Sequence, residues 1–223
     1  MVLVLLEHFF LKENVSFFIK NIKIGKMVEN DKLIINTVYY NEELKQYLNT
    51  DEPKLRQYLK HAIYLNIALV WGKLSRCKRK KVGAIIVHND NIVSCGYNGT
   101  PAGFDNCCEE PVVGRRAGGG RVDIVSIGEV KTKPEVLHAE SNAITKMAKS
   151  TTSCQNGILY STMAPCFECA KLIIQSGIKE VFYVEDYRDN GGKDLLRQAD
   201  IPCINITVDF INQIIEDHGE AVY

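Results

Sequence analysis

The sequence lacks net charge. Its 27 Lys and Arg residues balance 27 Asp and Glu residues, over a length of 223 residues. A dedicated nucleic-acid binder usually carries a basic excess, so this balance argues against a polymeric nucleic acid as partner, although it says little about a small anion. Apolar residues make up 46% and charged residues 24% of the chain, which is ordinary for a globular protein.

Long apolar runs are also absent. The segment 1–6 is apolar, but Glu7 and His8 follow at once and no basic segment precedes it. That is a poor secretory signal, and it is far shorter than the roughly 20 apolar residues of a transmembrane helix. We therefore expect a cytoplasmic protein that does not associate with membranes. Its eight cysteines are then expected to be reduced.

No internal repeat is evident, and the character of the chain changes near residue 52. Residues 1–52 carry no cluster of chemically active side chains, so we interpret them as an N-terminal extension of unknown role, with a strand over 33–40 and a short helix over 41–48. Residues 53–223 are interpreted as the domain proper.

Within 53–223, apolar residues at helical spacing predict a helix from 55 to 74. Residues 82–97 predict a β-hairpin with its turn at 88–91. A long Gly-rich connection over 98–137 follows, and loops of this length are usually functional. Beyond it, strands alternate with helices, which predicts an α/β layered fold with a mixed sheet. The predicted strands are 157–162, 180–184 and 203–208, and the predicted helices are 138–149, 166–176, 194–199 and 210–216.

Two short stretches carry the chemistry, His138-Ala-Glu140 and Pro165-Cys-Phe-Glu-Cys169. Cys166 and Cys169 are three residues apart and face the same way on a helix, whose N-terminus favours thiolates. Alone, a histidine is usually a core residue, and a Cys-x-x-Cys pair is a structural zinc site or a redox pair. Together they supply three ligands and leave a fourth position for water, which is typical of catalytic zinc. The pattern H-x-E…P-C-x-x-C is the signature of zinc deaminases that act on cytosine or adenine.

The same stretches suggest a mechanism. Zinc lowers the pKa of a bound water to about 7, and Glu140 is predicted to accept the water proton, deliver it to N3 of a cytosine ring and then help to protonate the leaving amine. Glu168, between the two cysteines, is expected to face away from the metal as a solvated residue.

Over residues 55–208 the chain resembles the deoxycytidylate (dCMP) deaminases of the cytidine and deoxycytidylate deaminase family. The stretches that carry the resemblance are 82–87, 96–103, 138–144 and 165–181. The metal motif is common to all zinc nucleobase deaminases, whereas Gly96-Tyr-Asn-Gly99 and residues 170–181 are more specific.

The resemblance implies a three-layer α/β/α cytidine-deaminase-like fold with a central sheet of about five strands. It implies hydrolysis of dCMP to dUMP and ammonia by a homohexamer, with dCTP as activator, dTTP as inhibitor and Mg²⁺ as a companion of a triphosphate effector. His138, Cys166 and Cys169 would hold zinc, and Glu140 would move protons. The residues that would bind substrate or effector are Tyr97, Asn98 and Gly99.

Several alternatives stay open from the sequence. The first alternative is an enzyme that deaminates dCTP or another cytosine or guanine compound. Less favoured alternatives are a nucleic-acid deaminase and a non-catalytic zinc-binding scaffold, in which Glu140 would have no function. The residues considered for the phosphate are Arg76, Lys78, Arg79, Lys80, Lys81, Arg115, Arg116 and Arg121, against the alternative that they are solvated surface.

A second, structural zinc is the other open question. Some phage-type relatives carry one, and Cys77 and Cys107 stand where two of its ligands would be, with Cys108 adjacent. No histidine lies between 88 and 138 to complete it, so unmetallated thiols are the alternative.

Overall fold

The computed structural model describes residues 26–29, 32–35, 37–38, 52–114, 123–124 and 129–218. At its centre lies a mixed sheet with the strand order β3-β12-β11-β10-β4-β5. Strand β4 (Gly83–His88) pairs antiparallel with β5 (Asn91–Tyr97) and with β10 (Ile158–Met163). From β10 onward the neighbours are parallel: β11 (Glu180–Glu185), β12 (Cys203–Ile206) and β3 (Thr37–Val38). The predicted mixed sheet is confirmed, with β3 as a short sixth strand.

The strand predicted over 33–40 is wrong as a single element. Strand β2 (Lys32–Ile35) pairs with β1 (Lys26–Glu29) in a separate antiparallel ladder, whereas β3 joins the edge of the main sheet. The predicted strand is therefore two strands, because β2 pairs with β1 whereas β3 pairs with β12. The helix predicted over 41–48 lies outside the described residues.

The predicted hairpin is formed by β4 and β5. Asn89 and Asp90 form its turn with φ angles of 50° and 59°, and this left-handed conformation is the one that two-residue hairpin turns require. Because β4 lies between two strands and under helices, its apolar run is buried almost throughout.

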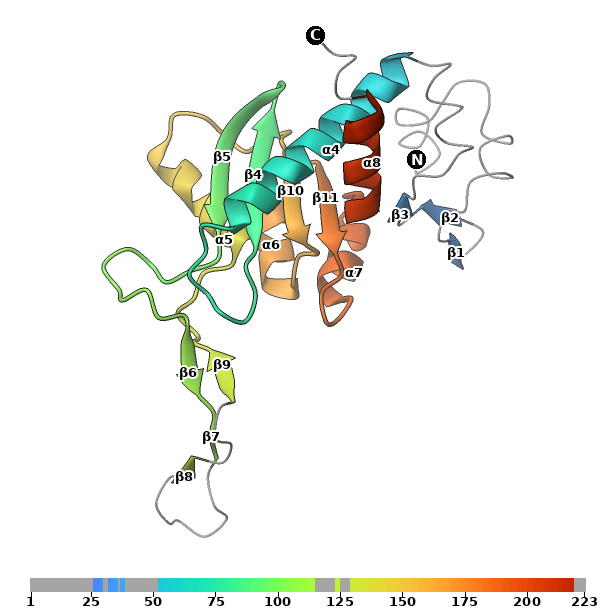
Figure 1. Ribbon diagram of the computed structural model, residues 1–223. Coiled ribbons are helices and arrows are strands. Elements are labelled where there is room, and N and C mark those ends of the chain that lie inside the picture. Colours follow the sequence, from blue (N-terminus) through green and yellow to red (C-terminus); the bar gives the residue numbers. More distant parts are fainter. Residues whose placement is uncertain are drawn as a thin grey trace.

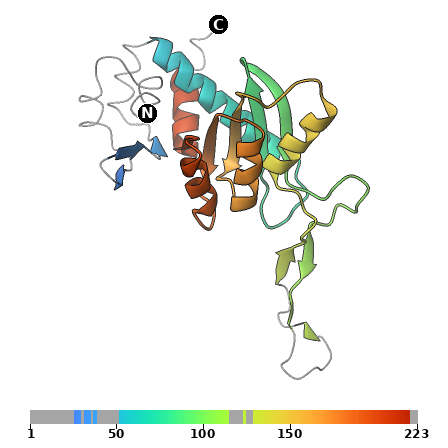
Figure 2. The ribbon, with the colours of Figure 1, turned by 180° about the vertical axis from the view of Figure 1, so that it is seen from behind.

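Helices cover both faces of the sheet, which confirms the three-layer α/β/α fold. Helices α4 (Glu52–Gly72) and α8 (Val208–His218) lie on one face (Figure 1). Helices α5 (Ala139–Lys146), α6 (Phe167–Gln175) and α7 (Gly191–Gln198) lie on the other (Figure 2), and a 3₁₀ turn over Met147–Lys149 continues α5. Among the described residues, no helix is both long and apolar enough to cross a membrane.

Helix α7 starts at Gly191 rather than at the predicted residue 194. The Asp189 carboxylate accepts a hydrogen bond from the Gly191 N–H at 3.1 Å. This side-chain cap satisfies a free N–H at the helix start, so the helix extends through two glycines that propensity alone would leave outside it.

A close approach of backbones sets the position of α5. A methyl group placed on Gly96 in β5 would lie 2.2 Å from the Ala139 carbonyl oxygen and 2.6 Å from the Ala143 nitrogen. Only glycine therefore lets the first turns of α5 rest directly on the sheet. Because the candidate metal ligand His138 immediately precedes α5, this contact fixes where its side chain can reach.

The long connection between β5 and α5 forms a projecting arm (Figures 1 and 2). Its base is the ladder of β6 (Glu109–Pro111) with β9 (Val130–Thr132), and further out β7 (Val113–Gly114) pairs with β8 (Asp123–Ile124). We use "arm" for the described residues 105–114, 123–124 and 129–133. The sequence predicted only a loop here, because each strand is too short to show a period.

A disulfide fastens the base of the arm to the segment that follows α4. It joins Cys77 to Cys108, with their Cα atoms 5.1 Å apart. The expectation that all cysteines are reduced is therefore wrong for this pair, because the fold brings two residues 31 positions apart into contact. A Glu109 side-chain oxygen also accepts hydrogen bonds from the backbone N–H groups of Lys78, at 2.7 Å, and Arg79, at 3.1 Å.

Candidate zinc site

Three of the predicted site residues come together at the starts of two helices. His138 immediately precedes α5, Cys166 immediately precedes α6, and Cys169 lies in the first turn of α6. One ligand atom from each lies within 4.8 Å of the other two. The Nδ1 atom of His138 is 3.3 Å from the Sγ of Cys166 and 3.5 Å from that of Cys169. Two helix N-termini thus direct their free N–H groups and positive dipole ends toward the thiols.

The donor set fits zinc. One imidazole nitrogen and two sulfurs are ligands that Zn²⁺ prefers, and three protein ligands leave one coordination position open. The hydrogen bond from the Cys169 thiol, together with His138, lowers the pKa of Cys166. The neighbouring Cys166 sulfur and burial raise the pKa of Cys169. A divalent cation would supply the positive charge that holds both side chains as thiolates.

Glu140 lies in the first turn of α5, and only 3% of its surface is exposed. Burial raises its pKa to about 7, although hydrogen bonds and the nearby imidazole of His138 act against this rise. A carboxyl group that titrates near neutrality can both accept and return a proton at physiological pH. Its carboxylate is not one of the three clustered ligand atoms.

A cleft of about 400 Å³ opens at the metal cluster. Its walls come from three places: the residues that lead into α5, the first turns of α6, and the segment that follows β11. The last segment contributes Tyr187, Arg188 and Asp189, and α6 contributes the half-exposed ring of Phe167. The sequence reasoning missed these residues of the third wall. The available signal was their place directly after a parallel strand, since ligands in open α/β sheets bind at the carboxyl ends of strands.

Tyr97, Asn98 and Gly99 lie beside α5 but do not line this cleft. Gly99 exchanges two backbone hydrogen bonds with Leu137, at 3.1 and 2.9 Å. The Tyr97 carbonyl oxygen accepts a hydrogen bond from Asn142 at 2.8 Å. These bonds tie the end of β5 to the residue before His138 and to α5, so the loop supports the metal cluster.

The side chain of Asn98 is already engaged. Its Oδ1 accepts a hydrogen bond from the Val82 N–H at 2.8 Å, and its Nδ2 donates one to the Lys80 carbonyl at 2.9 Å. Its own carbonyl oxygen accepts a hydrogen bond from the Ser75 hydroxyl at 2.8 Å. Asn98 therefore fixes the segment that enters β4, and its predicted contact with sugar or base stays a prediction.

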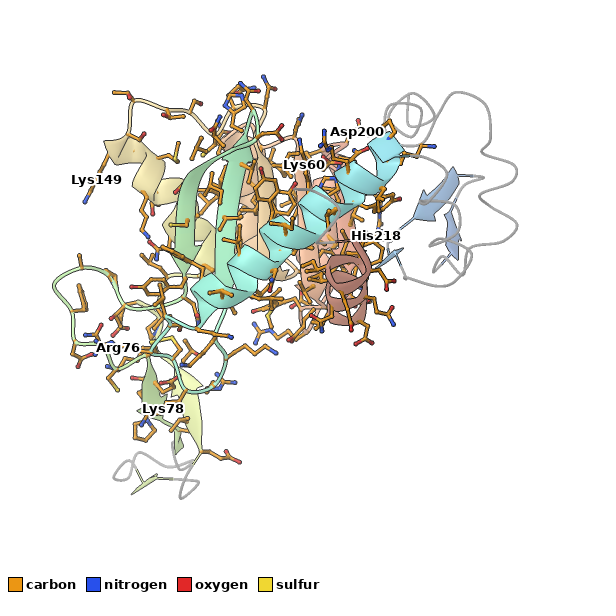
Figure 3. The ribbon with its side chains drawn as sticks, turned by 45° about the horizontal axis from the view of Figure 1, so that its top comes forward. Lys60, Arg76, Lys78, Lys149, Asp200 and His218 are labelled. Atoms are coloured by element: carbon orange, nitrogen blue, oxygen red, sulfur yellow. A yellow bond between two sulfur atoms is a disulfide. The ribbon has the colours of Figure 1, made fainter. Side chains whose placement is uncertain are left out.

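The basic run over 76–81 does not line the cleft either. Figure 3 shows Arg76 and Lys78 close to the base of the arm. Lys80 forms an ion pair with Glu185, and the Arg79 guanidinium donates a hydrogen bond to Thr132 in the arm at 3.0 Å. Arg115, Arg116 and Arg121 lie outside the described residues.

Two other expectations concern single residues. Glu168 has a side chain that is 76% exposed and pairs with Lys171 at 2.5 Å, as expected for a solvated position. The second metal site is not formed from the described residues, in which the one cluster of three or more candidate ligands is that of His138, Cys166 and Cys169. Cys107 is exposed, while Cys77 and Cys108 are bonded to each other in the disulfide and offer no thiolate to a metal.

Comparison with known proteins agrees with this site. The model of the "Cytidine and deoxycytidylate deaminase zinc-binding region" matches residues 58–185. Deoxycytidylate deaminase of Enterobacteria phage T4 is 35% identical over 186 residues, which cover 70% of this chain and 94% of the relative. The Homo sapiens deoxycytidylate deaminase is 40% identical over 130 residues, which cover 57% of this chain and 66% of the relative.

A solved structure is similar over the same region. The crystal structure of dCMP deaminase from the cyanophage S-TIM5, in complex with dCMP and dUMP, has a TM-score of 0.54 and 35% sequence identity, and the match covers 75% of this chain and 99% of the other. Together with the His/Cys/Cys cluster, these matches show that the chain belongs to the cytidine and deoxycytidylate deaminase family and is a deaminase enzyme with a candidate zinc site.

Proposed function

We propose that the protein hydrolyses dCMP to dUMP and ammonia. The observation that carries the proposal is the convergence of His138, Cys166 and Cys169 at two helix starts. The buried carboxyl group of Glu140 lies in the first turn of α5, directly after His138 and Ala139. The choice of dCMP is supported by the relatives of this chain, since those from phage T4, Homo sapiens and cyanophage S-TIM5 are dCMP deaminases.

In this proposal His138, Cys166 and Cys169 hold the zinc ion. When bound, zinc supplies Lewis acidity and lowers the pKa of water at its open position. Glu140 accepts the proton of the attacking water and transfers it to N3 of the cytosine ring. The same carboxyl then helps to protonate the amine at C4, which leaves as ammonia while the water oxygen stays on the ring.

Burial is what suits Glu140 to both transfers. A carboxylate in water is a weak base, whereas burial raises the pKa of Glu140 to about 7, so that accepting and releasing a proton are nearly balanced. Glu140 lies on a helix whose backbone packs against Gly96, and its side chain is almost fully buried, so neighbouring atoms limit the movement of its carboxyl group. Preorganisation of this kind lowers the reorganisation needed during the reaction.

Several finer points are proposals that rest on the resemblance. The enzyme is activated by dCTP and inhibited by dTTP, and Mg²⁺ accompanies the triphosphate effector. Tyr97, Asn98 and Gly99 lie near the effector or the substrate. The protein assembles as a homohexamer, and residues 53–223 form its catalytic domain. We also propose the cytoplasm, where cellular reductants would keep the thiols of Cys166 and Cys169 available for zinc and would also tend to open the Cys77–Cys108 disulfide. A second zinc at Cys77 and Cys108 would first require reduction of their disulfide.

One assay tests the proposed function. Ammonia release is measured with dCMP, dCTP, deoxycytidine and a cytosine-containing oligonucleotide, each with and without dCTP or dTTP as effector. We expect dCMP to have the highest kcat/KM. A preference for the oligonucleotide or for dCTP would refute the proposal.

The roles of individual residues are tested by metal content. Glu140→Ala is expected to retain zinc and to lose turnover, whereas Cys169→Ala is expected to lose both. Loss of zinc from Glu140→Ala would show that Glu140 is a ligand and that the mechanism is wrong.

A further inference from the structure

The cleft at the metal cluster has few charged walls. The ionisable side chains that line it, within the described part of the chain, are the metal-cluster residues together with Glu168, Tyr187, Arg188 and Asp189. Arg188 is the single permanent cation among them. A nucleoside monophosphate brings about two negative charges at neutral pH, so a cation within reach of the cleft would favour its binding over that of the nucleoside.

The terminal nitrogens of Arg188 are available to bind a phosphate. Its side chain is 82% exposed, and its Nε lies 3.6 Å from an Asp189 oxygen, at the edge of ion-pair distance. Its guanidinium lies 5.3 Å from the centre of the Tyr187 ring, which supports the planar group from one side. Among the described residues, no hydrogen bond or ion pair engages its two terminal nitrogens. Those nitrogens form the fork that matches two phosphate oxygens.

Three other cations are engaged by partners outside the cleft or at its edge. Lys80 is paired with Glu185, and Arg79 is bound to the arm through Thr132. Lys171 in α6 is paired with Glu168 and lies 5.6 Å from the centre of the Phe167 ring. Lys171 is therefore close to the cleft but does not line it.

We propose that Arg188 binds the 5′-phosphate of the nucleotide and so determines the preference for a monophosphate over the free nucleoside. This inference rests on the proposed function and names a residue that the sequence reasoning did not consider. Tyr187 would position the guanidinium, and Asp189, which also caps α7, would limit its range. The cation then comes from the end of β11 and not from the basic run before β4.

The test compares Arg188→Gln with Lys171→Gln as the matched control. Both residues are exposed, so neither change should disturb folding. For each protein, kcat/KM is measured for dCMP and for deoxycytidine, and the dissociation constant of the product dUMP is measured by calorimetry. A hydrogen-bonded charge pair typically corresponds to about tenfold to a hundredfold in affinity.

We expect Arg188→Gln to lower the ratio of kcat/KM for dCMP to that for deoxycytidine by at least about tenfold, and to weaken dUMP binding by a similar factor. Lys171→Gln is expected to leave both within about twofold. An unchanged ratio in Arg188→Gln, or an equal fall in Lys171→Gln, would overturn the inference. A wild-type protein that does not prefer dCMP to deoxycytidine would instead refute the proposed function, so the two failures are distinguishable.

Discussion

Acid sensitivity of folding should depend on His61, a buried residue of α4. Its side chain shares a 2.8 Å hydrogen bond between Nδ1 and the Tyr160 hydroxyl, and its ring stacks on Phe182 with centroids 4.1 Å apart. Burial, assisted by the nearby charge of Lys60, lowers the pKa of His61 from 6.5 to about 3. The native state therefore keeps the imidazole neutral over a pH range in which the unfolded chain binds a proton.

The lowered pKa of His61 links proton binding to unfolding, and this sets the direction and size of the pH effect on stability. Between pH 6.5 and 3 the unfolded state holds more protons than the native state at this site, so the free energy of unfolding falls as the pH falls. Each pH unit in that window is worth about 1.4 kcal/mol. Between pH 7 and pH 4.5, His61 should therefore remove about 2 to 3 kcal/mol of stability, a large fraction of the 5–15 kcal/mol typical of a domain.

A second, partly buried group acts in the opposite direction. Burial raises the pKa of Glu180 to about 7, so its contribution to stability is greatest at low pH and decreases as the pH rises from about 4.5 to 7. The two contributions partly cancel in the wild-type protein. The test must therefore compare a variant with the wild type at each pH rather than follow one protein alone.

The assay is urea unfolding of wild type and His61→Phe at pH 7 and at pH 4.5. We expect the difference in unfolding free energy between the two proteins to shift by about 2 to 3 kcal/mol in favour of His61→Phe at the lower pH. Tyr160→Phe is the control: it removes the hydrogen bond but keeps the imidazole buried, so most of the pH dependence should remain. A difference between wild type and His61→Phe that stays constant across pH would refute the reasoning.

Three further predictions concern how the site is held. Gly96→Ala should lower zinc content and activity, because the new methyl group would lie 2.2 Å from the Ala139 carbonyl oxygen and push α5 away; metal analysis of the purified variant checks this, and full zinc occupancy would contradict it. Asn98→Ala leaves the Val82 N–H and the Lys80 carbonyl without partners, and should cost about 2 to 4 kcal/mol of unfolding free energy by urea titration; a loss of activity with unchanged stability would instead favour direct contact with substrate. Replacing both Cys77 and Cys108 by Ser opens a link across 31 residues and should lower stability by about 3 kcal/mol, and dithiothreitol should do the same to the wild type but not to the variant.

The sequence alone was enough for the metal cluster and for most of the sheet and helices. His138, Cys166 and Cys169 were identifiable because their chemistry depends on local spacing and on helix starts, and both are encoded over a few residues. The hairpin at Asn89 and Asp90 was predictable for the same reason, since two-residue turns have a strong local signature.

Only the tertiary structure decided the surroundings of that cluster. It showed that Cys77 pairs with Cys108 and that the Asn98 side chain is hydrogen-bonded to backbone groups. It also placed Arg188 in the wall of the cleft. None of these follows from spacing, because each depends on which distant segments the sheet order brings together. The metal-binding residues are thus recognisable from short sequence motifs. The cleft around them, which is expected to determine the substrate, forms through contacts between segments that are far apart in the chain.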